Sequence, residues 1–255
     1  MYNDEYAATA AGAAAKVGLL KKNPLGYFLL SALAGAYIGF GILLSFTVSG
    51  TLGAIPITKI AMGLSFGIAL SLVIIAGAEL FTGNAFVLYN GWRSKTVTLT
   101  DVIRLWVVCY LGNWFGAIVL SLLFYGAAGT AGGVGQALAN AAAMKMSLPP
   151  LVLFLRGILC NVLVCLAVWC GFRCKSDSGK LIMVFWCLYA FFTCGFEHSV
   201  ANMTVLTLGL LNPAGTAVSV GGYLYNLFMV TLGNIVGAVL FLSIPYGIAA
   251  KKIGD

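Results

Sequence analysis

Gly77-Ala-Glu-Leu-Phe-Thr-Gly-Asn84 returns 118 residues later as Gly195-Phe-Glu-His-Ser-Val-Ala-Asn202, with the glycine, the glutamate and the final asparagine in register. Each copy places a carboxylate and an amide inside a long apolar stretch. Such groups are costly in hydrocarbon, so two matched copies indicate one site built twice around a pathway through a membrane. Leu111–Ala117 (LGNWFGA) also returns, as Leu232–Ala238 (LGNIVGA), 121 residues later. The two halves of the chain are therefore copies of each other.

The composition is that of a membrane protein. Apolar residues make up 61% of the 255 residues and charged residues only 8%, against roughly 45–50% and 25% in soluble domains. A helical span needs about 20 apolar residues, and six runs qualify: 26–48, 60–90, 102–127, 149–172, 181–211 and 222–249. The sequence predicts an all-α polytopic membrane protein. We expect a cytoplasmic helix over residues 1–22, a first repeat over 23–127 and a second repeat over 145–250.

Positive charges gather in alternate connections between the spans. They lie before span one, between spans two and three, between spans four and five, and after span six: Lys16, Lys21, Lys22; Arg93, Lys95, Arg104; Arg173, Lys175, Lys180; Lys251, Lys252. The positive-inside rule then places both termini in the cytoplasm. With three spans per half, the second half enters from the opposite side, so the repeats are inverted. The net charge of +7 reflects these loops and predicts no nucleic-acid partner.

Spans two and five carry the repeated motif at their centres. Glycines, a buried glutamate and an asparagine can satisfy a backbone that leaves helical geometry and then resumes it, so both spans are predicted to be broken. Glu79 and Glu197 are expected to accept hydrogen bonds from the freed amides, and their direct participation in transport is the open alternative. A half-helix that begins at the membrane centre also favours an anion near its positive dipole end.

His198 is the only histidine and takes the place that Leu80 has in the first copy. A lone histidine is ordinarily a packing residue. This one is predicted to lie in mid-membrane beside Glu197, and imidazole is the side chain whose unperturbed charge change falls near neutral pH. We therefore predict a functional role for His198.

Glycine pairs predict how the helices pack. Small residues four positions apart let helix backbones approach closely where lipid removes the hydrophobic drive for association. The chain has four such pairs: Gly35/Gly39, Gly63/Gly67, Gly112/Gly116 and Gly233/Gly237. A tight helical bundle is expected.

Four motifs resemble those of the formate/nitrite transporter family: Gly77–Asn84, Leu111–Gly116, Gly157–Trp169 (GILCNVLVCLAVW) and Gly195–Met203 (GFEHSVANM). The likeness runs from about Asn23 to the end of span six and is closest to the nitrite-type and hydrosulfide-type branches. It implies an aquaporin-like protomer of six transmembrane helices, with helices two and five broken, in a homopentamer where each protomer has its own pore. It also implies the cytoplasmic membrane of a bacterium or archaeon.

The resemblance also assigns residues to the pathway. The family's central histidine falls on His198, and the threonine that bonds it falls on Thr82. The lysines of the two pore mouths fall on Lys145 and, in a looser register, on Lys16, and pore-side amides fall on Asn161 and Asn202. Two hydrophobic slits follow, a cytoplasmic one and an outer one: Leu70, Leu80 and Phe81; Phe66, Val164 and Phe191.

These residues predict passage of a small monovalent weak-acid anion across the lipid bilayer. A bare charge in low dielectric costs many kcal/mol, so such a group is usually neutralised. Lys145 and the half-helix ends would concentrate the anion by electrostatic focusing, and His198 would lend it a proton or a charge between the slits. Nitrite or hydrosulfide is favoured and formate is possible.

Two other classes of protein compete with this interpretation. An aquaporin-like channel for neutral solutes needs its Asn-Pro-Ala signature twice, whereas Asn212–Ala214 occurs once; water or glycerol flux without anion current would favour it. A membrane enzyme or respiratory subunit is disfavoured, because one histidine cannot ligate a haem twice. The seven cysteines lack a metal-binding spacing, so no metal or other cofactor is expected.

Overall fold

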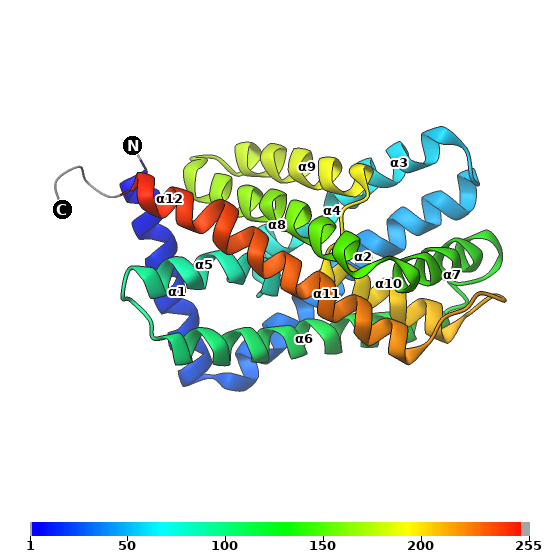
Figure 1. Ribbon diagram of the computed structural model, residues 1–255, viewed down its shortest axis with the longest axis horizontal. Coiled ribbons are helices and arrows are strands. Elements are labelled where there is room, and N and C mark those ends of the chain that lie inside the picture. The colour runs from blue at the N-terminus through cyan, green and yellow to red at the C-terminus, as the bar shows by residue number, and fades with distance from the viewer. Residues whose placement is uncertain (1, 251–255) are drawn as a thin grey trace.

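The structure is a computed structural model that describes residues 2–250 (Figure 1). Its elements in chain order are α1 (Asn3–Lys22), α2 (Pro24–Leu52), α3 (Pro56–Phe66), α4 (Ile68–Leu72), the π-helical turn η1 (Val73–Gly77), α5 (Phe81–Arg93), α6 (Leu99–Gly126), α7 (Gly132–Ser147), α8 (Pro150–Arg173), α9 (Asp177–Cys194), α10 (Ser199–Leu211), α11 (Val220–Ala238), the π-helical turn η2 (Val239–Ser243) and α12 (Ile244–Ala249). Lys251 and Lys252, which contributed to the predicted topology, lie outside the described residues.

Six helical stretches of residues 2–250 are long and apolar enough to cross a membrane. They are Pro24–Leu52, Pro56–Gly77, Leu99–Gly126, Pro150–Arg173, Asp177–Cys194 and Val220–Ala249. The second and fifth stop short of the predicted spans, and the chain resumes after a break as α5 and α10. The predicted all-α fold with two broken helices is confirmed.

Local sequence explains where several helices begin. The Asn23 side chain accepts a hydrogen bond from the Gly26 N–H at the start of α2, where Pro24 needs no backbone partner. Thr98 and Asp101 form a reciprocal capping box at the start of α6. Ser219 caps α11 in the same manner as Asn23 caps α2.

Glycines bring the helices of each half into backbone contact, as predicted. Gly35 of α2 faces the backbone of Asn113, and Gly116 of α6 faces the backbone of Ala32, so a Cβ at either position would clash. In the second half Gly233 and Gly237 of α11 face the backbone of α8 in the same way. The pairs α2–α6 and α8–α11 are therefore matching cores of the two halves.

The two halves run in opposite senses. Helix α1 lies at one end of the molecule and α7 at the other, and α2 and α8 start from these opposite ends (Figure 1). Helix α7 was not predicted, because its sequence is rich in alanine and glycine and gives no long apolar run. It occupies in the second half the place that α1 has in the first.

Candidate functional site

The two helix breaks have the same backbone design. In the first half η1 ends at Gly77, whose φ of 79° is in the left-handed region, and α5 begins at Phe81. In the second half α9 ends before Gly195, with φ of 77°, and α10 begins at Ser199. Glycine adopts this conformation without steric cost, so the chain leaves the helix at each break and starts a new half-helix inside the molecule.

Asparagines from α6 and α11 satisfy the freed backbone groups. Asn113 accepts from the Phe81 N–H at 2.9 Å and donates to the Glu79 carbonyl at 2.8 Å. Asn234 accepts from the Ser199 N–H at 2.9 Å and donates to the Glu197 carbonyl at 3.0 Å. These are the asparagines of the repeated Leu-Gly-Asn motif.

The expected role of the two glutamate side chains is corrected by these bonds. Their carboxylates accept no hydrogen bond from a freed backbone amide of the breaks. Instead the Glu79 N–H donates to the Leu30 carbonyl and the Glu197 N–H to the Arg156 carbonyl, each at 3.2 Å. Asn113 and Asn234 already satisfy the freed backbone groups, and the glutamate carboxylates bond to lysines instead.

Glu79 forms an ion pair with the helix that precedes the first span. Lys16 of α1 lies 2.6 Å and 2.7 Å from its two carboxylate oxygens. Tyr27 and Asn84 also donate to this carboxylate, at 3.0 Å and 2.9 Å. Four hydrogen bonds from three donor groups therefore stabilise the charge of a buried carboxylate that would otherwise be costly.

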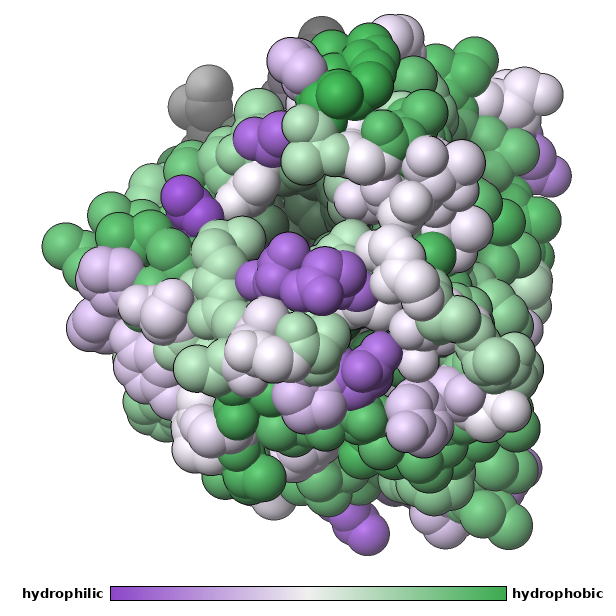
Figure 2. Space-filling view, turned by 90° about the vertical axis from the view of Figure 1, so that its right-hand side faces the viewer, coloured by the Kyte–Doolittle hydropathy of each residue, from purple (hydrophilic) through white to green (hydrophobic). Residues whose placement is uncertain are grey.

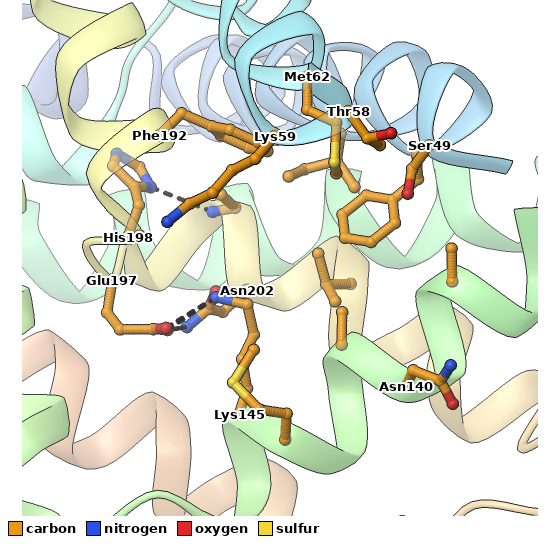
Figure 3. Close-up of a pocket in the computed structure, with 18 of the residues that line it drawn as sticks. Ser49, Thr58, Lys59, Met62, Asn140, Lys145, Phe192, Glu197, His198 and Asn202 are labelled. Carbon is orange, nitrogen blue, oxygen red and sulfur yellow. Dashed lines mark hydrogen bonds and ion pairs between the residues drawn. The ribbon is translucent and has the colours of Figure 1, made fainter. Parts of the chain in front are cut away.

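Glu197 forms the matching ion pair in the second half. Lys145 of α7 lies 2.9 Å from both of its carboxylate oxygens, and Asn202 donates to it at 2.7 Å. Figure 3 shows Glu197 and Asn202 turned toward each other across the wall of a cavity. Both predicted lysines thus reach the glutamate of their own half.

His198 and Thr82 meet between the two breaks. The Nε2 atom of His198 lies 3.0 Å from the Thr82 hydroxyl, and its Nδ1 accepts from the Ala201 N–H at 3.1 Å. Because Nδ1 is an acceptor, the neutral ring carries its proton on Nε2 and donates it to Thr82. The ring stacks on Phe191 with 5.9 Å between centroids. One residue from each half therefore builds this pair.

A constriction lies beside this pair and is lined by His198. The space is too narrow to hold a water molecule. Its walls are apolar side chains from both halves together with the imidazole: Ile38, Phe66, Leu70, Leu80, Val164, Leu188, Phe191 and His198. We call this space the central constriction. Five of the six residues predicted to form slits line it.

Phe81 and Asn161 lie elsewhere. The Phe81 ring packs against Trp106 and Tyr110 and lines a separate apolar groove outside the central constriction. Asn161 is fully buried and donates to the carbonyls of Thr82 and Asn234, so it braces the breaks from α8.

Two cavities adjoin the central constriction. The α1 vestibule, of about 500 Å³, contains Lys16, Leu30, Glu79 and Lys180 and shares Leu70 and Leu80 with the constriction. The α7 vestibule, of about 750 Å³, contains Lys59, Lys145, Arg156 and Glu197 and shares Phe191 and His198 with it. Figure 2 shows the α7 end of the molecule, where hydrophilic residues gather around a hollow in the surface.

Sequence reasoning missed Lys59 as a residue of the site. Lys59 follows a connection that carries few charges. Only its place near the start of α3, the first part of the broken second span, could have suggested a role. Arg156 lies within the predicted span 149–172, where the sequence does not determine the direction of its side chain. Both line the α7 vestibule.

Six spans in an inverted repeat, with two vestibules meeting at a constriction, define a membrane transport protein. The family model described as formate/nitrite transporter matches residues 4–248. The chain belongs to the formate/nitrite transporter family, whose members are transporters and channels and not enzymes.

Named relatives agree with this assignment. The chain is 40% identical to the nitrite transporter NirC of Salmonella typhimurium, over 99% of this chain and 93% of the relative. Its structure resembles that of an FNT family ion channel with a TM-score of 0.92, at 39% identity, over 97% of this chain and 99% of the other. It also resembles a pentameric formate channel with formate bound, with a TM-score of 0.81, at 30% identity, over 91% of this chain and 99% of the other.

Proposed function

We propose that the protein is a channel for small monovalent weak-acid anions, with nitrite or hydrosulfide favoured and formate possible. We further propose a homopentamer in the cytoplasmic membrane of a bacterium or archaeon, with both termini and the α1 vestibule on the cytoplasmic side. The relative named as a nitrite transporter supports the choice of anion, and the pentameric formate channel supports the assembly.

The contact between Thr82 and His198 carries the proposal. It lies at the wall of the central constriction, which His198 lines, between two vestibules that each contain a lysine. An anion in this space has lost its water, and apolar walls give it no hydrogen bond. The Nε2–H of His198 is the single ring donor, because Nδ1 already accepts from the Ala201 N–H, and it donates to Thr82 when no anion is bound. An anion that replaces the Thr82 hydroxyl as the acceptor receives this hydrogen bond where its desolvation cost is greatest.

The vestibules would deliver the anion to this point. Lys16 and Lys145 are each paired with a glutamate, so each ammonium can contact a passing anion without forming a deep trap for it. The N-terminal amides of α5 and α10 begin beside the constriction and add the positive ends of two helix dipoles. Weak binding at several points allows an ion both to enter and to leave. The anion then crosses the constriction hydrogen-bonded to His198 or as its neutral acid.

Flux through the purified protein in liposomes tests the function. Formate, nitrite and hydrosulfide are compared between about pH 5 and pH 8, the range in which imidazole and weak acids exchange protons. We expect flux of at least one of these anions that rises as pH falls, and no such flux in empty liposomes. Water or glycerol flux without any anion flux would instead indicate the neutral-solute channel.

A further inference from the structure

The two vestibules carry different net charge, although they are built from matching elements. In the α1 vestibule Lys16 pairs with Glu79 at 2.6 Å and Lys180 pairs with Asp177 at 3.0 Å. In the α7 vestibule Lys145 pairs with Glu197 at 2.9 Å. Lys59 and Arg156 line the same cavity, and neither has a carboxylate within 4.0 Å among residues 2–250. Two positive charges among the lining residues therefore remain uncompensated in the α7 vestibule, and none among those of the α1 vestibule.

Arg156 replaces an apolar residue of the first half. The carbonyl that accepts the Glu79 N–H belongs to Leu30, and the carbonyl that accepts the Glu197 N–H belongs to Arg156, both at 3.2 Å. Leu30 lines the α1 vestibule as Arg156 lines the α7 vestibule. A guanidinium thus stands in the second half where the first half has a leucine.

Lys59 has a counterpart that is neutralised. Lys59 is the fourth residue of α3, and Lys180 is the fourth residue of α9. The first residue of α9 is Asp177, which pairs with Lys180, whereas the first residue of α3 is Pro56, which has no charge. The Lys59 ammonium extends toward the His198 side of the cavity (Figure 3), and a Cβ on Gly195 would lie 3.8 Å from it.

We propose that Lys59 and Arg156 form an anion-collecting site in the α7 vestibule, separate from the Lys145–Glu197 pair. The inference rests on the proposed transport of anions. A cavity with apolar walls and charge of one sign raises the local concentration of the opposite ion and its rate of entry, and salt weakens this effect. The pathway then conducts anions more readily from the α7 side than from the α1 side at low ionic strength.

Arg156 also favours a particular shape of anion. A guanidinium presents a planar fork of N–H donors that fits a planar group with two oxygens. Nitrite and formate have this shape, whereas hydrosulfide and chloride offer a single centre. The collecting site therefore discriminates for anions with two oxygens before they reach the central constriction.

Cys194 supplies a reporter inside the same cavity. Its thiol is free and exposed, and the residue lines the α7 vestibule. Anionic sulfonatoethyl and cationic trimethylammonioethyl methanethiosulfonates react with the same thiol, so the ratio of their rates reports the local potential. Serine replaces Cys170 and Cys174, the other cysteines that are not buried. Intact mass gives the extent of labelling of the full-length protein.

We expect Lys59→Gln and Arg156→Gln each to lower the anionic-to-cationic rate ratio about fivefold at low salt, the size expected for unit charges roughly 8 Å apart in water. About 0.5 M salt should abolish most of the difference. Lys180→Gln is the matched control and should leave the ratio unchanged. Arg156→Lys should keep the ratio, because the charge remains, but should lose protection of Cys194 by nitrite relative to chloride.

A ratio that neither glutamine substitution changes would overturn the collecting site, whatever the flux in liposomes. A fivefold change together with absent anion flux would overturn the proposed transport function and leave the charged cavity intact. In the transporting protein, currents at low salt should be larger for anions entering from the α7 side, and Lys59→Gln with Arg156→Gln should equalise the two directions. Equal currents in the unsubstituted protein would contradict the proposed asymmetry.

Discussion

The α1 and α7 vestibules are built from matching structural elements but differ in their chemistry. Each has a half-helix, an asparagine that holds the break, and a glutamate paired with a lysine from an added helix. At the centre the copies diverge. His198 occupies the repeat position that Leu80 has in the first copy, and Thr82 occupies the position that Val200 has in the second copy. Duplication supplied a symmetric frame, and the chemistry comes from positions where the symmetry is broken.

The frame is the part where substitutions should cost most. Asn113→Ala or Asn234→Ala would remove one acceptor and two donated hydrogen bonds from buried backbone groups. Unsatisfied buried groups cost about 1–3 kcal/mol each, so each variant should lose about 4 kcal/mol of stability. Thermal unfolding of the purified protein should show similar losses for the two variants.

Asn140→Ala serves as the control for these two changes. Asn140 is exposed and bonds only to Gln136, so its loss should shift the unfolding temperature little. A large loss in one half and none in the other would contradict the matching roles of Asn113 and Asn234.

The ion pairs should differ in strength between the halves. Lys145→Met would leave Glu197, whose side chain is only 2% exposed, with Asn202 as its remaining partner. Breaking a buried pair costs about 3–5 kcal/mol, and we expect about 3 kcal/mol here. Lys16→Met should cost about 1 kcal/mol, because Lys16 is 25% exposed and Glu79 keeps Tyr27 and Asn84 as donors.

Thermal unfolding again provides the measurement for the ion pairs. Adding Glu197→Gln to Lys145→Met should restore part of the stability, because no uncompensated charge then remains. If Lys145→Met and Lys16→Met lose equal stability, the number of remaining donors around each glutamate does not determine the strength of the two ion pairs.

Substitutions at the turns should cost less than those at the frame asparagines or at Lys145. Gly77→Ala and Gly195→Ala would force alanine into φ values of 79° and 77°, at a cost of about 1–2 kcal/mol each. Asparagine tolerates this conformation better, so Gly195→Asn should cost less than Gly195→Ala. If chemical denaturation shows that Gly195→Asn is less stable than Gly195→Ala, the effect does not come from the backbone conformation.

The sequence predicted the frame well because its signals are local and repeated. Two copies of one motif, at a fixed distance along the chain, located both breaks, and six apolar runs located the spans. The roles of the glutamates could not be predicted, because their lysine partners lie on α1 and α7, 63 and 52 residues away. Helix α7 itself gave no apolar pattern by which it could be recognised.

The constriction shows a second limit of prediction. Leu80 and Phe81 are neighbours in the chain, but Leu80 is the cap and Phe81 the first residue of α5. The backbone at Leu80 is extended, and successive side chains of an extended segment point to opposite sides, so Leu80 reaches the constriction and Phe81 turns toward α6. The motif located both residues, and only the packing of α6 decides which of them faces the pathway.

The most direct measurement of the central claim is nitrite flux into liposomes for the unsubstituted protein and His198→Asn, side by side, across the pH range given above. If the imidazole donor in the central constriction carries the anion across, its loss should lower flux about tenfold, equivalent to about 1.4 kcal/mol, and alter the pH dependence. The variant should still fold, because the frame asparagines are untouched. If His198→Asn leaves both the flux and its pH dependence unchanged, the account of the central constriction is wrong.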